Sequence, residues 1–252
     1  MPLHPTAVCC LLTFALLTTT APTSKATTIA AVVTSENIVL AADSLATKVS
    51  AKGPTGVEFT EKLEAFGPTI VAAGGLAKAD NGRAFDVFQL AAQACRNSYG
   101  VDAQAQVFAD LMRSKLPSVV TTLRTQAGKD AATMPSSIFS TVWFCGLENK
   151  RPTIYAVVSE IGLGVQYQTK ITIRRYPPSS NPRGCGVVFM GPASLRGRSF
   201  DLNPNRLRDL PYLIEEADRV VRTGISDPQG HSGGAVTIVQ ISRQGNRVIS
   251  KS

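Results

Sequence analysis

Residues 27–43, TTIAAVVTSENIVLAAD, contain two short strand-like stretches, 27–33 and 38–42, separated by the turn Ser35-Glu36-Asn37. The first is apolar from Ile29 onward and the second throughout. Continuous apolar runs of this length between turn residues are typical of buried β-strands. We therefore expect this stretch to form a hairpin in the interior of the protein.

The remaining pattern predicts further strands and three helices. Helical spacing of apolar residues indicates helices over 80–98, 103–125 and 205–223, with Pro117 expected to kink or split the second and Gly224 to cap the third. Strands are predicted over 55–66, 69–73, 137–147, 153–160, 164–174, 185–190, 232–242 and 247–250. Two sheets packed face to face with helices outside them satisfy this order. We predict an α+β fold, a four-layer α-β-β-α sandwich, in one domain over residues 27–252.

The segment before this domain has the pattern of a signal peptide. The apolar run Ala7–Leu17 is too short to span a bilayer, and small residues flank the junction at Ser24 and Ala26. Lys and Arg are missing before the run, which leaves an ordinary propeptide or an uncleaved anchor as alternatives. We interpret residues 1–26 as a signal peptide. This predicts a secreted or periplasmic protein that begins at Thr27 and keeps no stable membrane anchor.

Composition restricts the chemistry. The formal net charge is +8, but no run interleaves the basic residues with aromatic ones, so we expect no nucleic-acid partner. Histidine occurs only at positions 4 and 231, and His4 lies in the predicted signal peptide. The single histidine left after cleavage excludes a multi-histidine zinc site. We expect neither a metal nor a cofactor. Cys95, Cys145 and Cys185 do not form a disulfide framework, although a single disulfide between two of them stays open.

A threonine exposed at the N-terminus would carry a nucleophile and a base in one residue. Its free α-amine can accept the hydroxyl proton, whereas the amide nitrogen of an internal threonine is not basic. Cleavage after Ala26 would therefore activate the protein as well as export it.

Four segments together resemble proteasome β-type subunits, a family of N-terminal nucleophile (Ntn) hydrolases. Residues 27–47 resemble the beginning of the mature subunit, and Glu61–Phe66 resembles the segment with the catalytic lysine. Ala72–Gly75 is similar to the family's A-G-G turn, and His231–Val236 is similar to its Y-S-G-G-A-V segment. The segments follow one another in the family's order over essentially the whole of residues 27–252.

The resemblance implies a threonine-type peptidase and assigns its site. Thr27 would be the nucleophile, Lys62 would lower the pKa of its hydroxyl and amine, and Asp43 would orient Lys62. An N–H of Gly74 would stabilise the oxyanion, Ser232 would hydrogen-bond near the terminal amine, and Gly233 would allow the tight geometry there. The resemblance also implies a peptide or small amide substrate and a homo-oligomer of rings or stacked dimers.

Departures from the family pattern keep two other functions open. Gln229 stands where the family has an aspartate, with Asp227 as a displaced substitute, and Pro192 stands at a serine position, with Ser194 nearby. These changes would fit a non-catalytic, secreted proteasome-like protein. Export without an unfoldase would fit a small-molecule amidase or acylase of the Ntn class.

The residue before Thr27 indicates how the leader would be removed. Ala26 replaces the glycine that precedes the threonine in self-processing members, which favours signal peptidase as the processing enzyme.

Residues 230–234, GHSGG, also match the G-x-S-x-G motif of serine hydrolases. That reading requires a separate histidine base. His231 is adjacent to the serine, and in a strand its side chain would point to the opposite face, so we reject this reading.

Overall fold

The computed structural model describes residues 27–50, 53–79, 85–127, 137–162, 169–181, 184–191, 195, 198–226 and 233–251. The predicted signal peptide, residues 1–26, lies outside the described residues. The described chain is a mixed α+β structure with two five-stranded antiparallel sheets and three α-helices. None of these helices is long and apolar enough to cross a membrane.

The first sheet contains the predicted hairpin at its centre. Its strand order is β12-β1-β2-β13-β14. The bounds are β1 Ile29–Val33, β2 Asn37–Asp43, β12 Gly186–Met190, β13 Val236–Ser242 and β14 Gly245–Lys251. β1 and β2 pair antiparallel with Ile29 opposite Ala42, which confirms the hairpin. All five residues of β1 are buried, because both faces of this sheet are covered.

The second sheet has the order β11-β10-β9-β6-β5. Its strands are β5 Leu63–Phe66, β6 Thr69–Gly75, β9 Ser137–Glu148, β10 Arg151–Gly162 and β11 Thr169–Tyr176. Two short hairpins extend the architecture: β3 Leu45–Ser50 with β4 Gly53–Phe59, and β7 Lys78–Ala79 with β8 Phe85–Asp86. The sequence pattern did not predict β3, β7 or β8. The single strand predicted over 55–66 is wrong, because this stretch forms β4 and β5, which belong to different sheets.

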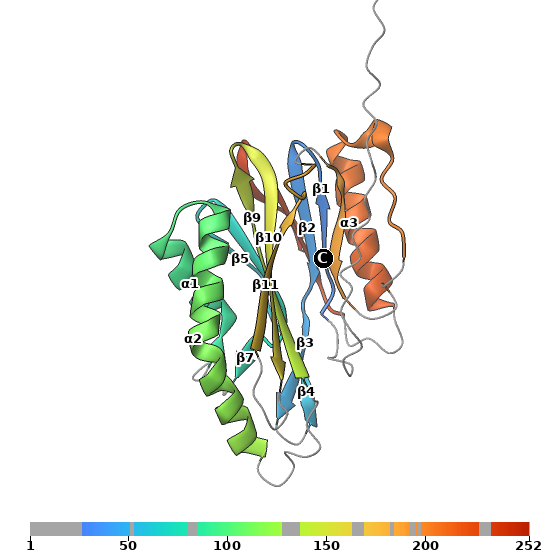
Figure 1. The fold of residues 1–252 in the computed structure, drawn as a ribbon. Helices are drawn as coiled ribbons and strands as arrows, with labels where there is room; N and C mark the ends of the chain where they lie inside the picture. The colour runs from blue at the N-terminus through green and yellow to red at the C-terminus, as the bar shows by residue number, and fades with distance from the viewer. Residues whose placement is uncertain are drawn as a thin grey trace, which may run out of the picture.

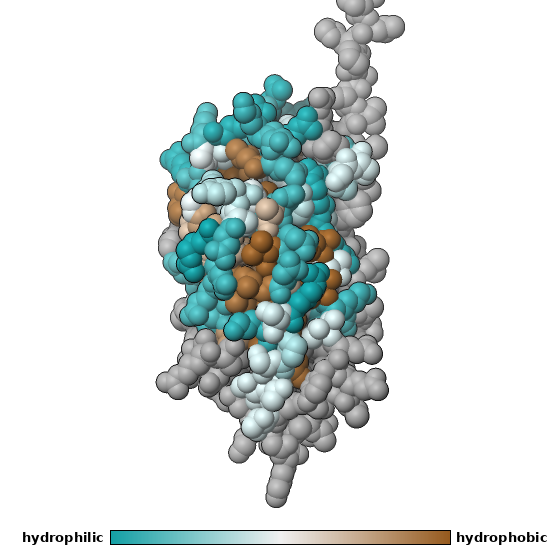
Figure 2. Space-filling model, turned by 60° about the vertical axis from the view of Figure 1, so that its left-hand side comes forward, coloured by the Kyte–Doolittle hydropathy of each residue, from teal (hydrophilic) through white to brown (hydrophobic). Residues whose placement is uncertain are grey.

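The helices cover the outer faces of the two sheets (Figure 1). α1 (Val87–Asn97) and α2 (Val101–Ala127) lie over the second sheet, and α3 (Leu210–Ile225) lies over the first. A separate hydrophobic cluster fills each interface between neighbouring layers. Figure 2 brings the side with α1 and α2 forward, where hydrophilic residues surround small hydrophobic areas.

Three details of the helix predictions were wrong: the start of α1, and the start and the cap of α3. α1 begins at Val87, not near residue 80, because the Asp86 side chain accepts the N–H groups of Phe88 and Gln89 and caps the helix there. Pro117 was expected to kink or split the second helix, and α2 continues through it without being split. α3 begins at Leu210 after the cap Asp209.

The predicted start of α3 is instead a separate 3-10 turn, Pro204–Arg206, capped by Asn203. Gly224 is not the cap of α3 either. It lies inside the helix, which ends at Ile225 and has Ser226 as its C-cap.

Candidate active site

The side chain of Thr27 lies against Gly74. Thr27 directly precedes the buried Thr28 and β1, while Gly74 lies in β6 of the other sheet. A Cβ atom added to Gly74 would lie 3.4 Å from Cγ2 of Thr27 and 3.7 Å from its Cβ. These are ordinary contact distances, so the backbone of the second sheet at Gly74 lies directly beside the side chain of Thr27.

Asp43, at the end of β2, is the centre of the polar contacts beside Thr27. Its Oδ1 accepts a hydrogen bond from the N–H of Thr28 at 2.8 Å and one from Nζ of Lys62 at 2.7 Å. Its Oδ2 accepts the N–H of Gly233 at 2.9 Å. Only 1% of Asp43 is exposed, so these three donors replace the water that would otherwise solvate the carboxyl group.

Lys62 precedes β5, and its ammonium group is buried with Asp43. Nζ also donates to the carbonyl oxygen of Leu45, and 5% of the residue is exposed. Burial lowers the pKa of Lys62, against the opposing effects of the charge and the hydrogen bond of Asp43. The backbone holds this lysine in place, since the N–H of Ala73 donates to the carbonyl of Lys62 at 3.0 Å.

Gly233 connects the segment before β13 to the same cluster. In addition to its bond to Asp43, its carbonyl accepts the N–H of Leu45 at 3.0 Å. A Cβ atom added to Gly233 would lie 3.3 Å from Cδ2 of Leu45, so a larger residue would crowd this contact.

The structure thus brings together five of the six predicted site residues, from both sheets: Thr27, Asp43, Lys62, Gly74 and Gly233. The sixth, Ser232, lies outside the described residues, as do Gln229, Asp227, His231, Pro192 and Ser194. Asp43 links Lys62 directly to the peptide group between Thr27 and Thr28.

Sequence reasoning missed three contributors to this geometry. Thr28 and Leu45 act through backbone atoms, which leave no signature in side-chain identity. Gly224 contacts the side chain of Thr28, although the sequence indicated a helix cap. Only the position of Thr28 could have been predicted from the sequence. Side chains alternate along a strand, so Thr27 and Thr28 are expected to face opposite sides of the sheet.

A hydroxyl group beside a close backbone approach, with a buried ammonium held nearby, is suited to nucleophilic attack on a carbonyl group. Among the described residues, no three His, Cys, Asp or Glu side chains gather as a metal site would require. No protein-family model matches the chain, and no curated protein matches it.

Proposed function

We propose that this chain is an N-terminal-threonine hydrolase of amide bonds, a threonine-type peptidase with a proteasome-like Ntn fold. Removal of residues 1–26 would activate it by making Thr27 the first residue. One observation carries the proposal: Oδ1 of Asp43 accepts hydrogen bonds both from Lys62 and from the amide that follows Thr27. This arrangement fixes a buried cation and the backbone of the nucleophile to one carboxyl group.

The proposed reaction proceeds through an ester on Thr27. Oγ1 attacks the amide carbonyl carbon while the α-amine takes its proton, and the resulting oxyanion receives a backbone N–H at Gly74. Collapse of this intermediate breaks the C–N bond, and the amine leaves with the proton. Water then attacks the ester, which restores the Oγ1 hydroxyl and releases the carboxylic acid.

Lys62 contributes electrostatically in this proposal. A protonated amine near the hydroxyl and α-amine of Thr27 favours the deprotonated form of both groups. Asp43 keeps Lys62 oriented, because a buried ammonium without a partner tends to lose its proton. The small Gly74 leaves room for the substrate backbone to approach Thr27.

Three wider features belong to the same proposal. The protein is exported and processed after Ala26, it acts on peptides or small amides without a metal or cofactor, and it assembles into homo-oligomeric rings or stacked dimers. The leader pattern supports export, and the family resemblance supports assembly.

The deciding experiment is intact-mass analysis and N-terminal sequencing of the exported protein, before and after treatment with a peptide epoxyketone. We expect a start at Thr27 and the added mass of one inhibitor, joined to both the amine and the hydroxyl of Thr27. Thr27→Ala should abolish the adduct. Thr121→Ala, at an exposed threonine of α2, should form it at the wild-type rate.

Other outcomes would identify the other functions. A Thr27 start without an adduct would support the non-catalytic protein. An adduct together with hydrolysis of small acyl amides, but of no peptide in a fluorogenic panel, would support the amidase. A different N-terminus would contradict activation at Thr27.

A further inference from the structure

The side chain of Thr28 is enclosed by the last turn of α3. Thr28 is fully buried. A Cβ atom added to Gly224 of α3 would lie 2.4 Å from Oγ1 of Thr28 and 2.7 Å from its Cγ2. At such distances one side must move, so a glycine at position 224 is what allows the helix to lie this close to Thr28. Gly191, after β12, borders Thr28 from another direction, with its added Cβ at 3.6 Å from Cγ2.

Thr27 and Thr28 face opposite layers of the molecule. Further along β1, Ile29 and Ala31 pack between the two sheets, whereas Ala30 and Val32 pack under α3. Thr27 continues the first series toward Gly74, and Thr28 continues the second toward Gly224. Because the two residues are consecutive, a displacement of Thr28 by the helix would move the backbone that carries Thr27.

The backbone between the two contacts is held firmly. The N–H of Thr28 donates to Asp43 Oδ1, and its carbonyl accepts the N–H of Asp43 at 3.1 Å. The hydrogen bonds fix Thr28 along β2, while the contact with Gly224 limits how far it can move toward α3.

We propose that Gly224 and Thr28 are positioning residues, which together set the place of Thr27 relative to Gly74. The inference rests on the proposed function for its catalytic meaning. Neither residue touches the reacting atoms. Their contact acts mainly by shape, so shortening the side chain of Thr28 should make room for a methyl group at position 224.

The test is a double-mutant cycle. Gly224→Ala overfills the contact, and Thr28→Ala removes Oγ1 and Cγ2 and leaves it underfilled. In the double variant, the methyl group added at position 224 occupies the space that these two atoms leave. We expect each single variant to slow epoxyketone adduct formation about 10- to 100-fold, as small misplacements of reacting groups do. The double variant should recover most of the rate. Ala217→Gly, on the buried face of α3 but away from Thr28, weakens the helix and should leave the rate unchanged.

An NMR readout separates this inference from the proposed function. In the wild type, the γ-methyl of Thr27 should give a strong nuclear Overhauser effect to an α-proton of Gly74. The effect should weaken in Gly224→Ala and return in the double variant, whether or not Thr27 reacts. An unreactive wild type with this pattern would refute the hydrolase and keep the positioning role.

Unchanged Overhauser effects in the single variants, or a double variant no better than Gly224→Ala, would overturn the inference. If Gly224→Ala does not fold, Thr28→Val and Thr28→Ala decide the question. Valine keeps the shape of threonine and lacks only its hydroxyl group, whereas alanine loses the shape as well, so valine should retain more of both signals than alanine. Equal losses in the two variants would rule out positioning by shape.

Discussion

At Lys62, two effects act on the ionisation of one buried amine. Burial lowers its pKa, and the charge and hydrogen bond of Asp43 offset only part of this decrease. The ammonium form required by the proposed mechanism is therefore lost at a lower pH than in a free lysine. Reactivity at Thr27 should fall as the pH rises through this lowered pKa, below the ordinary lysine value of about 10.4.

The titration of Lys62 can be followed directly by the ¹³Cε chemical shift. We expect a midpoint below the ordinary value in the wild type, and a still lower one in Asp43→Asn, which removes the stabilising charge. The alkaline limb of epoxyketone reactivity should move in the same direction. A midpoint that does not change in Asp43→Asn would contradict the assigned pairing.

The side chains that form the candidate site could be predicted from short sequence segments, but the backbone groups that complete it could not. Asp43 and Lys62 occur in recognisable segments, and the structure brings them to 2.7 Å from each other. The carbonyl of Leu45 and the N–H of Thr28 complete the same cluster, yet every residue except proline carries both groups. Only the fold determines which backbone atoms reach a buried charge.

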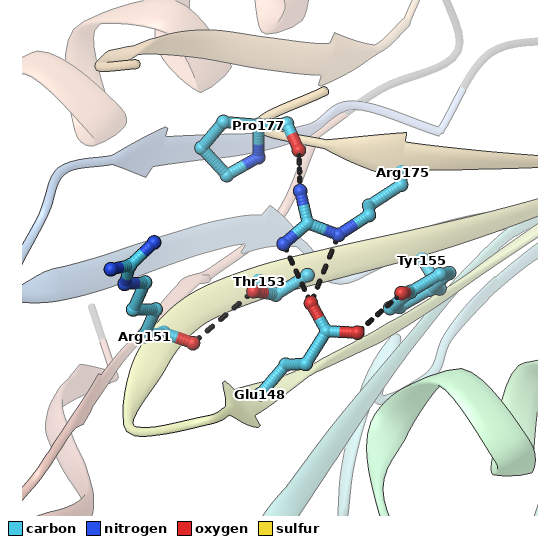
Figure 3. Close-up of polar contacts among 6 residues, drawn as sticks. All are labelled: Glu148, Arg151, Thr153, Tyr155, Arg175 and Pro177. Carbon is cyan, nitrogen blue, oxygen red and sulfur yellow. Dashed lines mark hydrogen bonds and ion pairs between the residues drawn. The ribbon is translucent and has the colours of Figure 1, made fainter. Parts of the chain in front are cut away.

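Among the elements, β9, β10 and β11 are joined by a polar cluster around Glu148, the last residue of β9 (Figure 3). Thr141, which pairs with Gly74 of the candidate site, lies toward the other end of β9. Oε1 of Glu148 accepts the Tyr155 hydroxyl at 2.6 Å, and Oε2 accepts Nε and Nη2 of Arg175 at 2.9 and 2.6 Å. Arg175 also donates to the carbonyl of Pro177. Partial burial and the bond to Glu148 raise the pKa of Tyr155 to about 12.

Glu148 should make a pH-dependent contribution to stability. Partial burial opposes its ionisation, but the hydrogen bonds from Tyr155 and Arg175 outweigh this effect and hold its pKa below the ordinary value. A lowered pKa stabilises the fold above the unfolded-state pKa, and this stabilisation is lost as the pH falls through the folded-state pKa.

We expect Glu148→Gln to reduce the free energy of unfolding by about 1 kcal/mol at pH 7, measured by urea denaturation. The difference from the wild type should vanish in acid, where Glu148 is protonated as well. Glu215→Gln, at an exposed glutamate of α3, should have little effect at either pH. A difference that persists in acid would assign the loss to packing.

Element types were more predictable than their ends. Apolar periodicity located all three helices, because each buries one stripe of side chains against a sheet. The starts of α1 and α3 depend instead on Asp86 and Asp209. Several residues near each start could act as a cap, and tertiary packing selects one of them. Pro117 likewise shows the limit of local preference, since it lies inside α2 although proline is unfavourable in the interior of a helix.

In the whole molecule, the candidate site lies where the two sheets meet. It should therefore depend more on the hydrophobic core between the sheets than on the cores beneath the helices. Asp43 ends a strand of the first sheet, and Thr27 lies two residues before another. Gly74 lies in a strand of the second sheet, and Lys62 directly precedes another. The core between the sheets includes Trp143, and Met190 packs against its edge. Sδ of Met190 would lie 3.3 Å from a Cβ atom added to Gly74, which connects this core to the contact with Thr27.

Trp143 and Phe144 provide a matched test, since they are consecutive in β9 and both fully buried on opposite faces. Within the described residues, Nε1 of Trp143 has no hydrogen-bond partner, so its replacement mainly alters packing. Trp143→Leu and Phe144→Leu should each lower the free energy of unfolding by about 1 to 3 kcal/mol.

Only Trp143→Leu should slow adduct formation at Thr27, because it lets the sheets shift relative to each other. Phe144 contacts the core beneath α1 and α2, which contains no site residue. Adduct rates would be measured well below the unfolding midpoint of each variant. Equal slowing in both would mean that the site responds to global stability and not to the packing between the sheets.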